Sequence, residues 1–225
     1  HIKVLLSMGV PMGLQYSITA IGSVILQAAV NGLGAVTVAA VTAGSKISSF
    51  CVAVTDALGA TMATYCGQNV GAGKLDRVRE GVKVATIIGI IYSVIVFVFM
   101  IFIGGELPKL FIDASKTDVI EKARIFLLWN SGFYFALIFV NVWRNSIQGM
   151  GFPMFAILSG VCEMFARGIV GFTGVKYFGF VAACMGSPLA WIIADMFLIP
   201  GFLYCLKKLG KVFGEKQTRE EFQYE

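Results

Sequence analysis

Charged residues are scarce in this 225-residue chain: only 14% of the sequence is Asp, Glu, Lys or Arg, whereas 57% is apolar. Soluble domains carry about 25% charged residues, and the mean hydropathy of +0.81 points away from them as well. Long stretches hold no charge at all: 4–45, 84–105, 125–143, 145–162 and 177–194. A bilayer crossing needs about 20 mostly apolar residues. The composition therefore excludes a soluble domain and predicts a polytopic membrane protein.

Metal-binding and catalytic motifs are missing too. His1 is the single histidine, and the five cysteines form no C-x-x-C pair, so we interpret the cysteines as apolar packing residues. The chain has no G-x-S-x-G elbow, no Walker lysine and no H-E-x-x-H motif. We therefore expect neither an enzyme nor a resident metal or cofactor.

Other protein classes are excluded by pattern. The short alternating segments of a membrane β-barrel, about ten residues each, are absent from the apolar runs. The net charge of +5 does not indicate nucleic-acid binding, because the basic residues lie at the ends of those runs. The chain opens without an initiator Met or a charged leader region, so no signal peptide is visible. We expect it to be the later part of a longer protein.

What the sequence does contain is a series of apolar helix patterns separated by glycine-rich turns. Helices are predicted over residues 9–31, 37–70, 82–104, 122–148, 153–175 and 180–207. We predict an all-α bundle of six transmembrane helices over residues 1–206 and a charged cytosolic tail over 207–225. The second helix would reach about 50 Å, against a hydrocarbon core of about 30 Å, so we expect it to tilt, break or project. Gly44 and Gly59 are the candidate breaks.

Orientation follows from the basic residues. Lys and Arg are about twice as abundant on the side that carries both ends of the chain as on the opposite side. By the positive-inside rule we expect both ends of the chain to lie in the cytosol. The membrane that the helices cross would be the cell membrane, either an inner or a plasma membrane. Between the third and fourth helices the two signs of charge nearly balance, and we expect an amphipathic interfacial helix there.

Ionisable residues inside spans are costly and usually face the bundle interior; here they are Lys46, Asp56, Arg144, Glu163, Arg167 and Asp195. Glu163 and Arg167 are four residues apart on one helix face, and an antiparallel last helix brings Asp195 to a comparable depth. We predict a network of these three, serving either to pin helices together or to bind substrate or protons. Arg144 is close enough to the surface to snorkel to the headgroups. Lys46 and Asp56 are too far apart to pair, so each needs another partner.

Uncharged polar residues form two further patterns. Gln15, Thr19 and Ser23 recur every four positions in the first helix, and Asn141 and Asn145 lie four apart on the fourth. Such stripes line an aqueous cavity or bond helices to one another, and the two interpretations are equally supported. We take all five as candidates for a substrate cavity.

Several segments together suggest a family. Gly67-Gln68-Asn69-Val70-Gly71-Ala72-Gly73 resembles the G-Q-x-x-G-A-G signature of the multidrug and toxic compound extrusion (MATE) family. Gly9-Val10-Pro11-Met12-Gly13, Gln148-Gly149-Met150-Gly151 and Ser187-Pro188-Leu189-Ala190-Trp191 resemble, in order, parts of that family's seventh, tenth and twelfth helices. The resemblance implies the C-terminal lobe of a twelve-helix antiporter. Its lobes exchange H⁺ or Na⁺ for organic, often cationic, drugs or metabolites by alternating access.

The resemblance also implies partners and reveals one departure. The expected partners are an N-terminal six-helix lobe, the lipid bilayer and a small organic substrate. Sodium-coupled members carry an acid in the seventh and in the tenth helix, where this chain has Thr19 and about Leu137. Coupling would then depend on an acid in the other lobe, or on Glu163 and Asp195. Two other functions stay open: a lipid-linked oligosaccharide flippase of the same superfamily, and a structural membrane subunit that does not transport.

Overall fold

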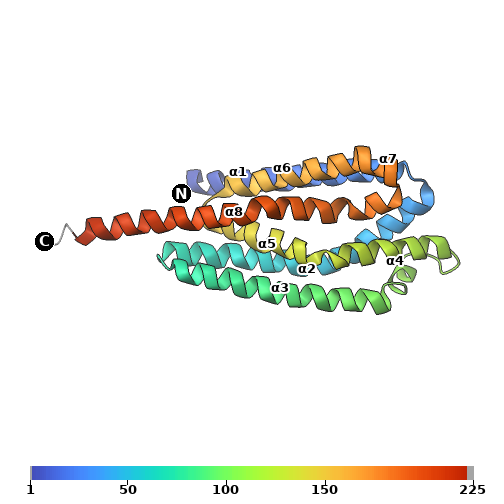
Figure 1. Ribbon diagram of the computed structural model, residues 1–225, viewed down its shortest axis with the longest axis horizontal. Helices are drawn as coiled ribbons and strands as arrows, with labels where there is room; N and C mark the ends of the chain where they lie inside the picture. The colour runs from blue at the N-terminus through green and yellow to red at the C-terminus, as the bar shows by residue number, and fades with distance from the viewer. Residues whose placement is uncertain (1, 222–225) are drawn as a thin grey trace.

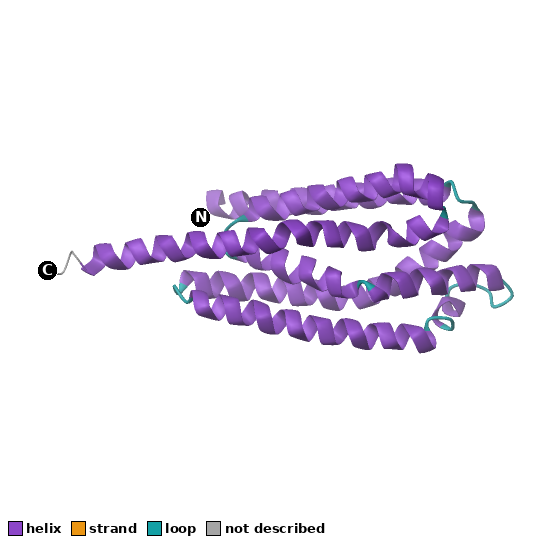
Figure 2. Cartoon of the chain, in the orientation of Figure 1, coloured by secondary structure: helices purple, strands orange, loops and turns teal. Residues whose placement is uncertain are grey.

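A computed structural model describes residues 2–221, and every regular element in this part of the chain is a helix (Figures 1 and 2). The elements are α1 (Ile2–Asn31), α2 (Ala35–Gly71), α3 (Leu75–Ile103), η1 (Leu107–Leu110), α4 (Thr117–Gly132), α5 (Tyr134–Gly149), α6 (Pro153–Ile169), η2 (Val170–Gly174), α7 (Val175–Phe178) and α8 (Phe180–Glu221). Element η1 is a single 3₁₀ turn and η2 a π-helical turn. The all-α prediction is confirmed.

Five helical stretches are long and apolar enough to cross a membrane, and α4 with α5 forms a sixth that is bent by 48°. The predicted bundle of six transmembrane helices is thus confirmed, with one broken span. The helices run lengthwise, and both ends of the chain lie at the same end of the bundle (Figure 1). Helices α1 and α6 pack together along one edge, α2 and α3 lie along the other, and α5 and α8 pack between them.

The broken span differs from the continuous helix predicted over 122–148. Its break falls at Phe133, whose φ of −108° and ψ of 11° depart from helical values. Just before it, Nδ2 of Asn130 donates to the carbonyl oxygen of Cys184 in α8 at 3.5 Å as well as to its own helix. An Asn that bonds the backbone competes with the helical ladder, and Gly132 weakens the helix further. Together these residues account for the bend.

Helix α2 is continuous through both predicted break points, so that prediction is wrong. The two glycines instead allow close packing. A Cβ atom on Gly44 would lie 2.6 Å from the ring of Phe126 in α4, and one on Gly59 would lie 2.7 Å from Nδ2 of Asn145 in α5. Small residues of this kind let helix backbones approach in a membrane.

The ends of the helices also differ from the predictions. Helix α1 begins at Ile2, which places Pro11 in its interior, and α8 continues past residue 207 and projects beyond the bundle (Figure 1). The predicted boundary between lobe and tail therefore falls within one helix, and residues 222–225 lie outside the described part. The prediction of an interfacial helix between α3 and α4 is wrong, because this connection contains only the turn η1. Gly104, Gly105 and Pro108 prevent a longer helix from forming there.

Helix α5 occupies the centre of the lobe and positions the candidate site. It packs against α2, α3, α6 and α8, and most of its side chains are buried. The largest apolar core cluster surrounds it, with residues from α2, α3, α4, α5 and α8. The buried polar side chains on α5 therefore need hydrogen-bond partners inside the bundle.

Candidate functional site

An ionic cluster joins α5 to α6 in the interior of the lobe. Glu163 accepts a hydrogen bond from Nη2 of Arg144 and forms an ion pair with Nη2 of Arg167 at 3.0 Å. Nε of Arg144 also donates to Oγ of Ser159 at 2.9 Å. Glu163 is 1% exposed, Arg167 5% and Arg144 6%. Because guanidinium groups stay charged, two buried positive charges share a single carboxylate here.

Asp195 of α8 lies beside this cluster without bonding to it. The charges of Arg144 and Glu163 act on its carboxylate. Its Oδ1 atom is buried and has no hydrogen-bond partner within residues 2–221. Nε and Nη1 of Arg167 are likewise buried without an acceptor in the same part of the chain. The Glu163–Arg167 pair thus forms as predicted, while Asp195 stays unbonded next to it.

Arg144 is the member of the cluster that sequence reasoning missed. It does not snorkel to the surface as predicted, because it is buried and points into the lobe. The connection between α5 and α6 is short, so the two helices are antiparallel, and Arg144 and Ser159 lie at similar distances from the turn. The long arginine side chain then reaches Glu163. The similar sequence distances of Arg144 and Ser159 from this turn are the signal that could have predicted the contact between Arg144 and the α6 residues.

A second polar cluster joins α2 to α5. Nδ2 of Asn141 donates to Oγ1 of Thr55 at 2.8 Å and to Oδ1 of Asp56 at 2.9 Å. Nδ2 of Asn145 donates to the carbonyl oxygen of Asn141 at 2.8 Å. Asn141 is buried, whereas Asp56 is exposed on the outer side of α2. Asp56 therefore has a partner from another helix, Asn141, as the sequence required. The rest of the Asp56 side chain is exposed outside the bundle.

The polar residues of α1 bond within their own helix. Oγ1 of Thr19 donates to the carbonyl oxygen of Gln15 at 3.0 Å, and Oγ of Ser23 donates to that of Thr19 at 3.2 Å. Gln15 and Thr19 pack against Gly160 of α6, whereas Ser23 is exposed. Of the predicted cavity residues, the structure brings Asn141 and Asn145 together and keeps the α1 residues apart from them.

A cavity of about 690 Å³ opens between α2 and the α3–α4 connection, at the end of the bundle opposite the termini. Nζ of Lys46 lies over the ring of Phe111 here, 5.9 Å from its centroid. Oδ1 of Asp113 accepts the backbone N–H of Ser115 at 2.9 Å, which holds the pKa of that carboxyl below its ordinary value. Charges of both signs therefore line this cavity.

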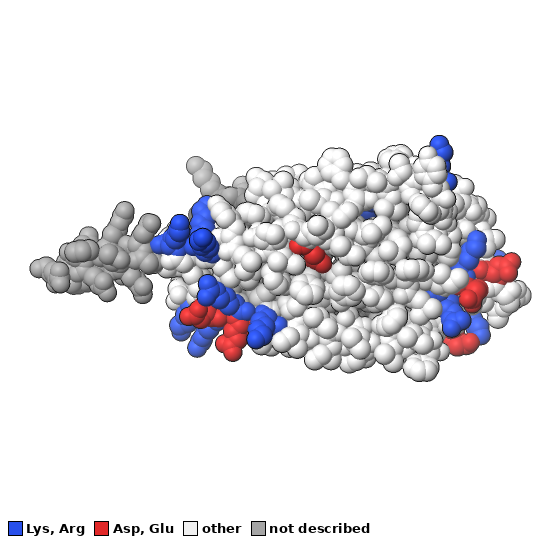
Figure 3. All heavy atoms as spheres, in the orientation of Figure 1, with Lys and Arg blue, Asp and Glu red and all other residues white. Residues whose placement is uncertain are grey.

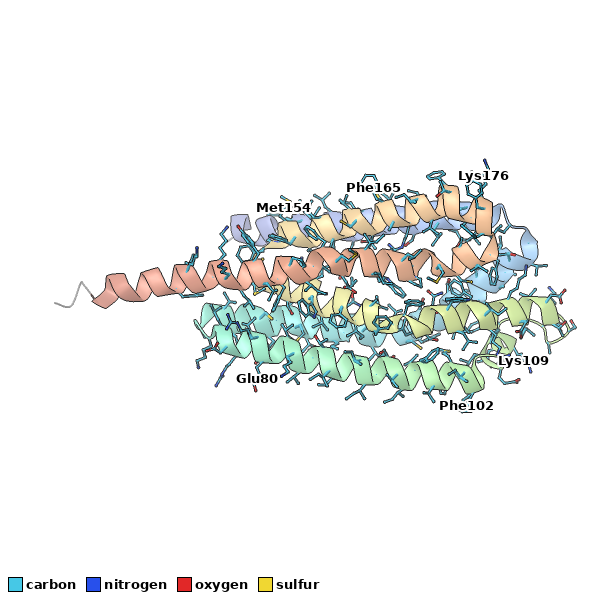
Figure 4. The ribbon with its side chains drawn as sticks, in the orientation of Figure 1. Glu80, Phe102, Lys109, Met154, Phe165 and Lys176 are labelled. Atoms are coloured by element: carbon cyan, nitrogen blue, oxygen red, sulfur yellow. The ribbon has the colours of Figure 1, made fainter. Side chains whose placement is uncertain are left out.

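Charge is distributed unevenly over the surface. Lys and Arg gather at the two ends of the bundle, and the middle of the visible face carries almost no charge apart from a small acidic spot (Figure 3). Met154, Phe102 and Phe165 project outward from the sides of the bundle, whereas Glu80, Lys109 and Lys176 lie near its ends (Figure 4). An apolar waist between two charged rims is the surface expected of a lobe that spans a bilayer.

The comparisons agree with this architecture. The family model described as MatE matches residues 11–173. The chain belongs to the MatE family. Over 87% of its length it is 20% identical to a solved MOP superfamily transporter from Pyrococcus furiosus and to an outward-facing multidrug resistance MATE family transporter, each with a TM-score of 0.77. Over 68% of its length it is 21% identical to an FAD transporter from Shewanella oneidensis.

The coverage of these relatives shows how much of the fold is present. The chain spans 34% of the FAD transporter and 43% and 44% of the two solved transporters. An inward-facing MATE structure matches with a lower TM-score of 0.70. This MatE chain therefore corresponds to less than half of a multi-pass transporter, as expected for one lobe, and the family predicted from its motifs is confirmed.

Proposed function

We propose that this MatE chain is the C-terminal lobe of a cation-coupled antiporter that exports organic solutes by alternating access. The observation that carries the proposal is Asp195, an unbonded carboxylate beside a buried ionic cluster in the membrane-spanning bundle. Ionisable residues at such depth are typical of ion pathways and proton relays. In repeat-built transporters, one lobe rocks against the other around a central site.

Glu163 and Asp195 have different roles in this proposal. Protonating Glu163 would deprive two buried guanidinium groups of the carboxylate that both contact, and removing one partner of a buried ion pair costs about 3–5 kcal/mol. Glu163 is therefore structural. Oδ1 of Asp195 has no hydrogen-bond partner among the described residues, and the four charges cancel only when Asp195 is ionised. Binding a proton at Asp195 gives the core one net positive charge, which is the electrostatic change that couples ion binding to lobe movement.

The proton is the coupling ion that these residues favour. Like other hard cations, a sodium ion needs several oxygen ligands, and in the described residues Oδ1 of Asp195 has no polar partner beside it. A proton needs a single carboxylate, and Asp195 supplies it.

Transport by the full-length protein in proteoliposomes tests this proposal. We expect Asp195→Asn to lower uptake driven by a pH gradient at least tenfold, while substrate exchange without a gradient continues and no longer depends on pH. The unfolding temperature of this variant should stay close to that of the wild type. Normal proton-driven uptake by Asp195→Asn would refute the role of Asp195, and loss of exchange together with unfolding would assign it a structural role.

The substrate class depends on the charges that face outward from α2. Asp56 is exposed in the middle of this helix, which favours an organic cation. An organic anion is the second candidate, because the relative from Shewanella oneidensis is an FAD transporter and Lys46 pairs with an aromatic ring in the outer cavity. Uptake of tetraphenylphosphonium should fall in Asp56→Asn and persist in Lys46→Gln. Uptake of FAD that is lost in Lys46→Gln would favour the anion.

A further inference from the structure

A groove of about 400 Å³ lies between α3 and α8, near the end of the bundle that carries both termini. Its walls are apolar: Val82 and Ile87 come from α3, and Leu203 and Leu206 come from α8. Trp143 of α5 also lines the groove. Helices α3 and α8 make few direct contacts with each other. We call this feature the α3–α8 groove.

Two cations, Arg79 and Lys83, line the same groove at its terminal end. They lie one turn apart on α3, and both are exposed. Among the described side chains, Arg79 has one ion pair, with Asp76 at 3.7 Å, and both members of that pair are solvated, at 63% and 99% exposure. Such a pair is weak and leaves most guanidinium donors free. The α3 residues that line the groove, from Arg79 to Ile87, extend about 12 Å along the helix. The α3–α8 groove therefore has two cations at its terminal end and mostly apolar side chains along the rest of its length.

The apolar part of the groove is held in place by hydrogen bonds and ring contacts. Nε1 of Trp143 donates to Oγ1 of Thr86 at 3.2 Å, and Oγ1 of Thr86 donates to the carbonyl oxygen of Val82 at 2.7 Å. The ring of Trp143 lies 5.0 Å from that of Phe202 and 5.8 Å from that of Phe139, measured between centroids. The groove is therefore preformed, and an occupant need not order its walls.

A second groove on α3 provides an internal comparison. It has a volume of about 510 Å³ and is lined by Phe97, Ile101, Trp129 and other uncharged residues of α3 and α4. Lipid tails are as apolar as these side chains, so any lipid fills this second groove equally well. Of these two grooves, the α3–α8 groove adds cations to an apolar wall and can distinguish one headgroup from another.

We infer that the α3–α8 groove binds one anionic phospholipid, with an acyl chain along Leu203 and Trp143 and the phosphate on Arg79 and Lys83. Basic pockets between transmembrane helices on the cytoplasmic side bind anionic headgroups in this way. The groove lies at the end where Lys and Arg predominate, which faces the anionic leaflet under the positive-inside rule. The apolar wall selects a lipid over a soluble phosphate ion. Two such cations imply a preference of about 30-fold for an anionic over a zwitterionic headgroup.

Native mass spectrometry of the full-length protein tests this inference without measuring transport. The protein is released from micelles that contain equal amounts of phosphatidylglycerol and phosphatidylcholine with identical chains. We expect one retained phosphatidylglycerol per protein, and we expect Arg79→Gln/Lys83→Gln to bring the preference close to one. Leu203→Trp, which fills the groove and leaves the cations in place, should expel the lipid.

The matched control is Lys74→Gln/Arg77→Gln, which removes one lysine and one arginine from the same end of the bundle, outside the groove. This variant should retain the preference. Equal retention of both lipids by the wild type would overturn the inference, as would an equal loss in the control, since the attraction would then be diffuse. Displacement of phosphatidylglycerol by inorganic phosphate would instead assign the cations to a soluble anion.

Discussion

Helices α2 and α3 are neighbours in the bundle, yet their exposed faces differ in chemistry. The exposed face of α3 is apolar through the membrane region: Ile87, Ile91, Val94, Ile95, Val98 and Phe102. Apart from Phe50 and Val54, the exposed residues of α2 at the corresponding depths are small or polar, among them Ser49, Ala53, Asp56, Ala57, Ala60 and Thr64. A charged side chain facing hydrocarbon costs about 2.5–3.5 kcal/mol. The α3 face therefore meets lipid, and the α2 face looks toward water or protein.

The same asymmetry continues inside the lobe. Behind the α2 face, Asp56 bonds to Asn141 on α5. Behind the α3 face, Gly89 makes room for Ile138 on the same central helix, and a Cβ atom at Gly89 would clash with that side chain. Helix α5 thus presents a polar side to α2 and an apolar side to α3. The exposed face of α3 thus has the composition of a lipid-facing surface, whereas the exposed face of α2 is continuous with the polar residues of the interior.

The largest expected effect comes from the interior charges. Glu163→Gln removes the carboxylate that Arg144 and Arg167 both contact, so we expect a loss of about 3–5 kcal/mol in the free energy of unfolding. Asp56→Asn on the exposed α2 face should change it by only about 0.5 kcal/mol. Thermal unfolding of the purified full-length protein measures both. Equal stability of the two variants would show that the cluster does not hold α5 to α6.

A charge moved onto either face tests which one meets lipid. Ile91→Asp places a carboxylate on the lipid face of α3 and should cost about 2.5–3.5 kcal/mol. Ala57→Asp places the same group on the α2 face, where water or protein polar groups receive it, and the expected cost is below about 1 kcal/mol. Membrane yield and unfolding temperature report the difference. Similar losses in both variants would contradict the assignment of the faces.

The mildest test leaves stability unchanged and measures access of water. Single cysteines at Ala60 and Ile95 replace exposed residues of α2 and α3. The thiolate is the reactive form and needs water to ionise, so a polar maleimide should label Ala60→Cys several times faster than Ile95→Cys in intact membranes. Labelling after denaturation calibrates both sites. Faster labelling of Ile95→Cys would reverse the comparison.

Features that depend on local spacing were determined by the sequence itself. Runs of uncharged apolar residues specified the helices, because each helix satisfies its own backbone in a membrane. The four-residue interval between Glu163 and Arg167 specified their pairing, since residues at that interval share a helix face. The glycine-rich motif that closes α2, together with three further segments, predicted the family that the match to the MatE model confirms.

Features that depend on contacts between distant segments were decided by the tertiary structure. Arg144 meets Glu163, and Asn141 meets Asp56, only because α5 packs between α2 and α6. Asp195 lies beside the cluster without a bond, although its sequence position alone allowed it to join. Periodicity assigns a residue to a face of its own helix, but only packing determines which helix, or lipid, that face meets.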